Sequence, residues 1–293
     1  MGSGKTLWKL LAVLVVLSGL LAGGYFFLED FSAAKVREVA GRYSNVVRFD
    51  FERAIINPFD RTFHIWGVHC DFAVGSSLSA DEIVIEKFDR EHDVPLFFKG
   101  SVKNVSVPVD FMNFGSYASE IRKLGYESLN FDLEADYIYE DRTRRLSVKN
   151  LGFDGSDICR ISAGFDLGDM KLQSPGLSGM IGVSMLDGGL VYHDHSLTGR
   201  VLELSASDEK LGIGEIKARL RERLQLRIQE ARSLGNGYAE NFYAGLQKFI
   251  DNPGKLVFRV DPEEPVPLLY LFMGRDFEEL LGIYGVTVEA ENL

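Results

Sequence analysis

The residues with the clearest potential for chemistry are His193, Asp194 and His195, two imidazoles separated by one carboxylate. Imidazole nitrogens and carboxylate oxygens are zinc ligands, and a zinc site needs three or four of them. In a strand, however, the two histidines would point to one side and Asp194 to the other. Asp194 also precedes a helical pattern that begins near Ser196, where an N-cap residue is expected. We therefore favour a capping role for Asp194 and predict no metal site and no cofactor.

The remaining histidines and the two cysteines indicate no reactive centre. His64 and His69 have opposite parity within one predicted strand, so they could share a metal only across a bulge. Cys70 and Cys159 fall on apolar strand faces, where thiols are inert. A single buried disulfide in an oxidising compartment is the alternative. No nucleophile elbow or His-Glu-x-x-His motif occurs, so we predict that the protein is not an enzyme, with a hydrolase that uses a scattered acidic site as the weaker alternative.

A third candidate is a basic cluster in a protein whose net charge is −11. The cluster lies in a predicted helix over residues 214–234 and consists of Lys217, Arg219, Arg221, Arg223, Arg227 and Arg232. It could contact an anionic partner, such as lipid head groups, lipopolysaccharide or the protein's own acidic strands. A solvated helix face is the alternative. A nucleic-acid binder is expected to be basic overall, so we expect no nucleic-acid partner.

The elements that carry these residues are mainly strands. From residue 128 to 139 the apolar side chains alternate with polar ones, and Phe131 faces inward while Asp132 faces outward. Together with the segments that follow, to residue 169, this predicts an antiparallel meander with one apolar and one acidic face, and a bulge near Asn150. An inward residue should be sensitive to a charge, so we expect Phe131→Asp to be strongly destabilising and Asp132→Ser to be nearly silent.

Other segments extend this pattern. Trp66, Val68, Cys70, Phe72 and Val74 alternate to one face of a predicted strand. Apolar residues at spacings of three and four predict helices over residues 31–43, 113–125, 196–205, 214–234 and 238–249. The last two are separated by a short Gly-Asn-Gly break, which predicts a helical hairpin on the sheet.

Residues 10–28 contain no charged side chain and would span about 28 Å as a helix, close to the thickness of the hydrocarbon core of a bilayer. Lys5 and Lys9 precede this segment, and Glu29 and Asp30 follow it. The charge order predicts a single-pass anchor with a cytoplasmic N-terminus. A cleaved signal peptide that ends near residue 24 is the alternative.

Several segments resemble one bacterial family. They are INPF before HIWGV, then LSADEIVIE, then the long stretch LGYESLNFDLEADYIYEDRTRRLSVKNLGFDG. In pattern, the chain is similar to the AsmA-like and related membrane-anchored envelope proteins of bacteria. The resemblance implies a long curved sheet in the periplasm, an inner-membrane anchor and a role in lipid or outer-membrane homeostasis. It carries no catalytic residues over.

We therefore expect an α+β fold with an N-terminal transmembrane helix, an extended curved antiparallel sheet covered by helices, and a C-terminal helical hairpin. Residues 1–30 would form the cytoplasmic stub and anchor, and residues 31–293 one periplasmic domain. That domain would be β-rich over 45–192, helical over 194–250 and closed by a strand, a helix and a strand over 255–291. The expected function is lipid binding or assistance in envelope assembly, with a scaffold that docks other envelope proteins as the alternative.

Overall fold

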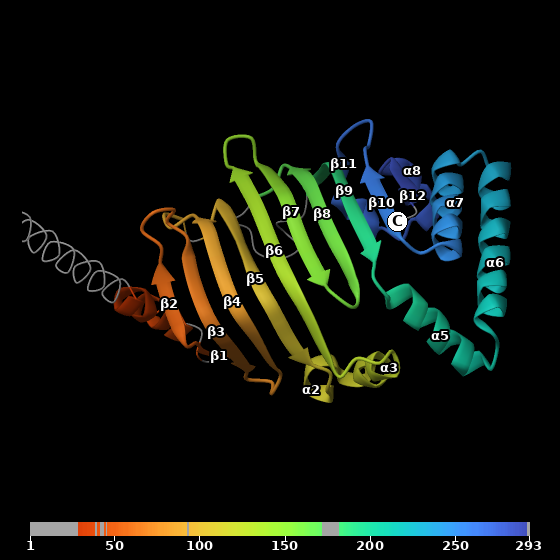
Figure 1. Cartoon of the computed structure of the whole chain (residues 1–293). Coiled ribbons are helices and arrows are strands. Elements are labelled where there is room, and N and C mark those ends of the chain that lie inside the picture. The colour runs from red at the N-terminus through yellow and green to blue at the C-terminus, as the bar shows by residue number, and fades with distance from the viewer. Residues whose placement is uncertain are drawn as a thin grey trace, which may run out of the picture.

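The computed structural model describes residues 29–38, 40–41, 44, 46–92, 94–171 and 182–291. These residues form a large antiparallel sheet with the strand order β1-β3-β4-β5-β6-β7-β8-β9-β10-β12 (Figure 1). Strand β2 also pairs with β3, and β11 pairs with β9. The sequence prediction of a large antiparallel sheet with helices is therefore confirmed. The described helices, which were expected to cover the sheet, pack at its borders instead.

The bounds of the elements follow the chain. The strands are β1 (Val47–Asp50), β2 (Arg53–Ile56), β3 (Phe63–Phe72), β4 (Ser77–Phe88), β5 (Phe97–Pro108), β6 (Ser128–Glu140), β7 (Arg145–Gly155), β8 (Cys159–Gly168), β9 (Ser184–Asp194), β10 (Lys255–Val260), β11 (Val266–Pro267) and β12 (Val286–Glu291). The helices are α2 (Phe111–Phe114), η1 (Gly115–Tyr117), α3 (Ala118–Lys123), α5 (Leu197–Glu209), α6 (Ile213–Ser233), α7 (Gly237–Asp251), η2 (Leu268–Phe272) and α8 (Phe277–Ile283). Residues 29–38 are also helical.

Alternation along the strands gives the sheet an apolar face and a polar face. Strand β6 pairs with β7 so that Leu133 lies opposite Phe153, while Asp132 lies opposite Asp154. The bulge predicted near Asn150 is present. Asp136 and Tyr137 are adjacent on β6, but their partners on β7, Asn150 and Val148, are two residues apart, so β7 contains one extra residue. The extra residue keeps the apolar side chains of β7 on one face on both sides of the bulge.

The backbone conformation of Gly67 corrects the predicted facing of β3, although β3 keeps one register with β4 on both sides of this residue. Gly67 has a φ of +62°, a value that glycine adopts without the steric cost met by other residues. The residues on either side shift phase, so Ile65 and Val68 both enter the apolar core. Trp66 faces the polar side instead, where its ring stacks on His64 at 5.3 Å. The prediction that Trp66 shares a face with Val68 is therefore wrong.

Within the described part of the chain, helices pack on the apolar face at its borders. Val36, in the N-terminal helical segment, packs on the core of β1–β5. The residues of α3 join a cluster that includes Val109 and Cys159 at one end of the strands. Helix α7 packs through Phe249 on β10 and β12. Helix α6 packs on α7 and forms the outermost layer beyond the last strands (Figure 1).

The helical predictions hold in part. The helix predicted over residues 113–125 is interrupted, because Gly115 has a φ of +57° and separates α2 from the 3-10 turn η1 and α3. The predicted hairpin is present as α6 and α7, and α7 is the member that contacts the sheet. Burial of Val288 beneath α7 requires a close approach, which Gly245 permits because a Cβ there would lie 2.8 Å from a Val288 methyl carbon.

The predicted membrane anchor is corrected by the helices of the structure. Among the helices that the described residues form, none is both long enough and apolar enough to cross a bilayer. Helix α6 has the length, at 21 residues, but charged residues occur throughout it, and charges are costly at the centre of a bilayer. Residues 10–28, on which the prediction rested, lie outside the described part of the chain. The fold class was therefore wrong to include a transmembrane helix, and the inner-membrane and periplasmic locations are withdrawn with it.

Candidate functional site

Three rows of mainly apolar residues cross the middle of the sheet from β5 to β8, and one of them continues to β9. In strand order the rows are Val102, Leu133, Phe153 and Ile161; Gly100, Ala135, Leu151, Ala163 and Leu190; and Phe98, Tyr137, Val148 and Phe165. Directly opposed side chains on one face of a sheet are near neighbours. The three rows therefore form one continuous surface, here named the central apolar face.

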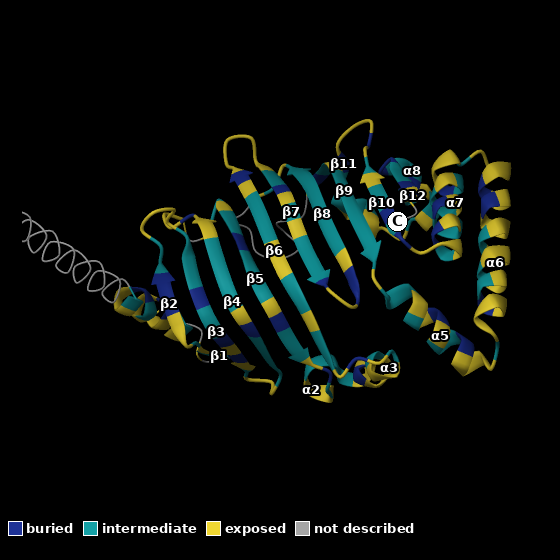
Figure 2. Ribbon diagram, viewed as in Figure 1, coloured by how far each residue is buried: buried dark blue, intermediate teal, exposed yellow. Residues whose placement is uncertain are grey.

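The central apolar face is incompletely covered. Leu133 is 38% exposed and Leu151 is 43% exposed, although both lie on strands that have a neighbour on either side. Phe153 and Phe165 are only partly buried. Figure 2 shows the same trend along β5–β8, where intermediate burial predominates and buried positions are few. Apolar side chains in the centre of a sheet are usually buried beneath another layer, so this surface is open to a further apolar partner.

The opposite, polar face carries a row of charges. Lys103 contacts Asp132 at 3.1 Å, Arg160 contacts Asp154 at 2.6 Å, and Asp132 and Asp154 are directly opposed across β6 and β7. The two cations offset the repulsion between the two carboxylates, which would otherwise be unfavourable. The row continues across β8, β9 and β10 through Arg160, His193 and Lys255, and Lys255 contacts Glu291 on β12 at 2.8 Å.

A cavity of about 390 Å³ opens on this polar row. Its lining includes Asn104, Asp132, Asp154, Arg160 and His195, which brings two carboxylates and an imidazole together. Both carboxylates already contact a cation, and the ring of His195 hydrogen-bonds through Nδ1 to the carbonyl oxygen of Gly155 at 3.0 Å. The arrangement therefore favours a structural charge network over an acid–base pair for hydrolysis.

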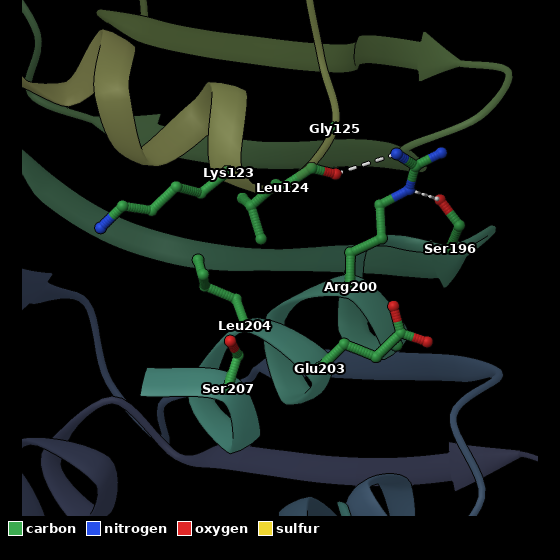
Figure 3. Close-up of a pocket in the computed structure, with 9 residues that line it drawn as sticks. Lys123, Leu124, Gly125, Ser196, Arg200, Glu203, Leu204 and Ser207 are labelled. Atoms are coloured by element: carbon green, nitrogen blue, oxygen red, sulfur yellow. Dashed lines mark hydrogen bonds between the residues drawn. The ribbon is translucent and has the colours of Figure 1, made fainter. Parts of the chain in front are cut away.

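Another cavity, of about 680 Å³, lies between α3 and α5. Figure 3 shows Leu124 and Leu204 on its two sides and the guanidinium of Arg200 at one end. Arg200 donates to the carbonyl oxygen of Leu124 at 2.9 Å and to Ser196 Oγ at 3.2 Å. It also stacks on the ring of Tyr126 at 4.5 Å. Arg200 thus connects α5 to the turn after α3. We interpret the cavity as the space that remains around these structural contacts.

The predicted basic cluster is largely engaged within the protein. The contacts are Lys217 with the carbonyl oxygen of Asp251, Arg219 with Glu209, Arg221 with Asp251, Arg227 with Glu230 and Glu278, and Arg232 with Glu240. These acceptors lie on the helices α5 to α8. Arg223 has no hydrogen bond or ion pair to any described residue. The proposed contact between the cluster and an anionic partner stays a prediction.

The histidines singled out in the sequence have separate roles. Asp194 Oδ1 accepts hydrogen bonds from the backbone N–H of Thr198 at 2.9 Å and from its hydroxyl at 2.7 Å. Its side chain therefore caps the first turn of α5, although the N-cap residue of the helix is Ser196 and not Asp194. His64 contacts Glu82 at 2.7 Å, whereas His69 contacts Asp71 at 3.1 Å. Across the residues that the structure describes, no group of three or more His, Cys, Asp or Glu side chains could hold a metal ion.

Both cysteines are free and buried. Cys70 lies on β3 and Cys159 on β8, and β4 to β7 lie between those strands. At about 4.8 Å per strand the two are far beyond the reach of a disulfide. Burial raises the pKa of each thiol, which lowers its reactivity because the thiolate is the nucleophile.

Sequence reasoning recognised the apolar face but missed which part of it stays exposed. Alternation places Leu133 and Leu151 on this face, yet whether a helix covers them depends on contacts distant in sequence. A further surface was also missed, a run of exposed apolar residues in and after η2. Its signal was the segment LLYLFM, which is nearly all apolar and follows a proline-rich link.

Comparison with known proteins gives one family. A family model described as "Uncharacterized protein" matches residues 152–291, from the end of β7 to the end of β12. The chain is similar to that family over this region, which contains α5 to α8 and the last strands. No curated protein matches the sequence. The resemblance to AsmA-like proteins is not tested by these findings and stays a prediction.

Proposed function

We propose that this protein is a non-enzymatic lipid-binding protein and that its central apolar face holds an acyl chain. The observation that carries the proposal is the exposure of Leu133 and Leu151 in the middle of a sheet whose borders are covered by helices. Exposed apolar surface bounded by polar or covered regions marks sites that bind apolar partners.

The dimensions of the face suit such a ligand. Four strand intervals separate β5 from β9 along the row that contains Leu151, which gives this row a length of about 19 Å. An acyl chain that fills one leaflet of a bilayer is about 15 Å long. The acyl chain therefore fits across the strands along the row that contains Leu151, with Leu133 in the neighbouring row beside it.

The expected affinity follows from burial. Each buried methylene contributes about 0.8 kcal/mol, so about ten methylenes contribute about 8 kcal/mol. That energy corresponds to a Kd of about 1 μM. Immobilising the ligand weakens binding further, so we expect a Kd between about 1 and 100 μM for a single chain.

A scaffold that docks partners through the acidic face has less support. The charges that cross this face contact one another, as Lys103 does with Asp132 and Arg160 with Asp154. A partner would have to replace these contacts, and exposed ion pairs of this kind contribute little to binding.

The test is direct binding of cis-parinaric acid, a fluorescent fatty acid, to the full chain. The double variant Leu133→Gln and Leu151→Gln should bind at least tenfold more weakly, because two amides would then face the acyl chain. Lipids extracted from the purified protein and identified by mass spectrometry would name the natural ligand.

A matched control replaces two exposed apolar residues away from the sheet, Ile213→Gln and Leu226→Gln on α6, which are 43% and 61% exposed. This control should bind the probe as the unaltered protein does. Equal weakening in both variants, or no binding by the unaltered protein, would contradict the proposal.

A further inference from the structure

An exposed run of apolar residues lies at the C-terminal end of the sheet. Leu269, Leu271, Phe272 and Met273 are 47–65% exposed, and Phe277 nearby is 49% exposed. Together these five residues are named the apolar strip. Runs of exposed apolar residues reduce solubility and are uncommon without a function, so the strip calls for an explanation.

The strip is held in place by the fold. The backbone N–H of Leu268 donates to the carbonyl oxygen of Val183 at 2.9 Å, and the hydroxyl of Tyr284 donates to the carbonyl oxygen of Pro267 at 2.9 Å. Strand β11, directly before the strip, pairs with β9. These contacts fix the start of η2, so the apolar side chains are presented on an anchored segment and are not the result of a frayed end.

A cavity of about 460 Å³ adjoins the strip. Its lining includes Tyr238, Glu263, Glu264 and Tyr270, and Tyr270 lies within the strip's own 3-10 turn. The carboxylates of Glu263 and Glu264 have no hydrogen bond or ion pair to any described residue. The cavity therefore combines aromatic rings with two negative charges that lack a cation.

Arg275, the cation closest to the strip in sequence, already has partners within the protein. Arg275 forms an ion pair with Glu279, and its guanidinium lies 4.7 Å from the centre of the Tyr270 ring. Asp276 and Glu278 add further negative charge along the same segment. An anionic lipid surface would be repelled here, whereas a cationic side chain would be attracted to both carboxylates.

We propose that the apolar strip and this cavity form a docking surface for a partner protein segment in which a basic side chain is flanked by apolar ones. The basic group enters the cavity near Glu263 and Glu264, and the apolar neighbours cover Leu271 and Phe272. Such a surface has the apolar centre and charged rim that are common at protein interfaces, and its charge selects basic partners. This site is separate from the central apolar face.

The probe is a fluorescein-labelled peptide of alternating leucine and arginine, with a peptide of alternating leucine and glutamate as its counterpart. Fluorescence anisotropy with the full chain should show binding of the arginine peptide alone. The double variants Leu271→Ser with Phe272→Ser, and Glu263→Gln with Glu264→Gln, should each weaken binding at least tenfold. A photo-crosslinker in the peptide should attach within residues 263–284.

A matched control removes the same charge elsewhere, through Glu127→Gln and Glu222→Gln, and should leave binding unchanged. Equal weakening by this control would overturn the proposal, because the attraction would then be due to net charge. The proposal also fails if the strip variant loses binding to phosphatidylglycerol vesicles, which would identify a membrane surface as the occupant. Loss of concentration-dependent self-association in the strip variant would identify a second copy of the chain and would likewise overturn it.

Discussion

Among single residues, Asp132 provides the sharpest test of whether contacts on the polar face stabilise the fold. Its carboxylate accepts a hydrogen bond from the backbone N–H of Asn104 at 2.7 Å, and it contacts Lys103 at 3.1 Å. Asn104 lies where the register between β5 and β6 shifts, with a φ of +50°. The carboxylate therefore satisfies a backbone donor that the strand ladder leaves free, so the substitution Asp132→Ala should destabilise the protein.

The size of the effect combines three contributions. A hydrogen bond to a charged acceptor contributes about 1.5–3 kcal/mol, which we reduce to about 1 kcal/mol because 37% of the Asp132 side chain is exposed. The ion pair with Lys103 adds about 0.5 kcal/mol. Relief of the repulsion from Asp154 offsets about 0.5 kcal/mol. The net loss is about 1 kcal/mol, which corresponds to a fall in Tm of about 3 °C for a domain of this size.

The assay is chemical and thermal denaturation followed by circular dichroism. Asp136→Ala is the matched control, since Asp136 lies on the same strand and face but has no hydrogen bond or ion pair to a described residue. The control should change the free energy of unfolding by less than about 0.5 kcal/mol. If the two variants have the same Tm, Asp132 does not stabilise the bulge, and the proposed role of this carboxylate is refuted.

Three further predictions concern other parts of the fold. Arg200→Ala should lower the free energy of unfolding by about 2 kcal/mol, because the hydrogen bond to Leu124 and the stacking on an aromatic ring are lost together; an unchanged denaturation midpoint would contradict this. Burial and then Lys255 lower the pKa of His193. The unfolded chain therefore binds a proton at a higher pH than the folded one, so stability should fall as the pH drops below about 6.5. His193→Gln should reduce that loss in Tm measurements between neutral and mildly acidic pH, and an identical slope would be evidence against the assignment. Both cysteines should react slowly with a thiol reagent until the protein unfolds, because burial raises the pKa of their thiols; rapid reaction of the native protein would show that they are accessible.

Alternation predicted the facing of the strands wherever the extended backbone conformation is uninterrupted. In β6 the positions of Phe131 and Asp132 follow the pattern. In β3 the pattern failed at Trp66, because the positive φ of Gly67 reverses which side chains face the core. The only indication of this change in the sequence was a glycine inside a strand. The expectation that Asp132→Ser is nearly silent also changes, because its contact with Asn104 comes from a strand 28 residues earlier in the sequence.

The candidate sites depended on contacts that spacing along one element does not show. Helical spacing located the basic residues of α6, but Glu209 and Glu240, which neutralise two of them, belong to neighbouring helices. The apolar pattern likewise located Leu133 and Leu151, while their exposure results from where α3 and α7 end on the sheet. Both features follow from tertiary packing, which overrides local pattern.

The central claim is that an acyl chain lies on the central apolar face, and the most direct measurement is quenching of a tryptophan placed on either face by a brominated fatty acid. Residues 133 and 134 are adjacent on β6 and point to opposite faces, so Leu133→Trp reports on the apolar face and Glu134→Trp on the polar face. We expect saturable quenching of the fluorescence of Leu133→Trp, whereas the fluorescence of Glu134→Trp should be quenched no more than that of the unaltered protein. Equal quenching of both variants, or quenching of Glu134→Trp alone, would contradict it.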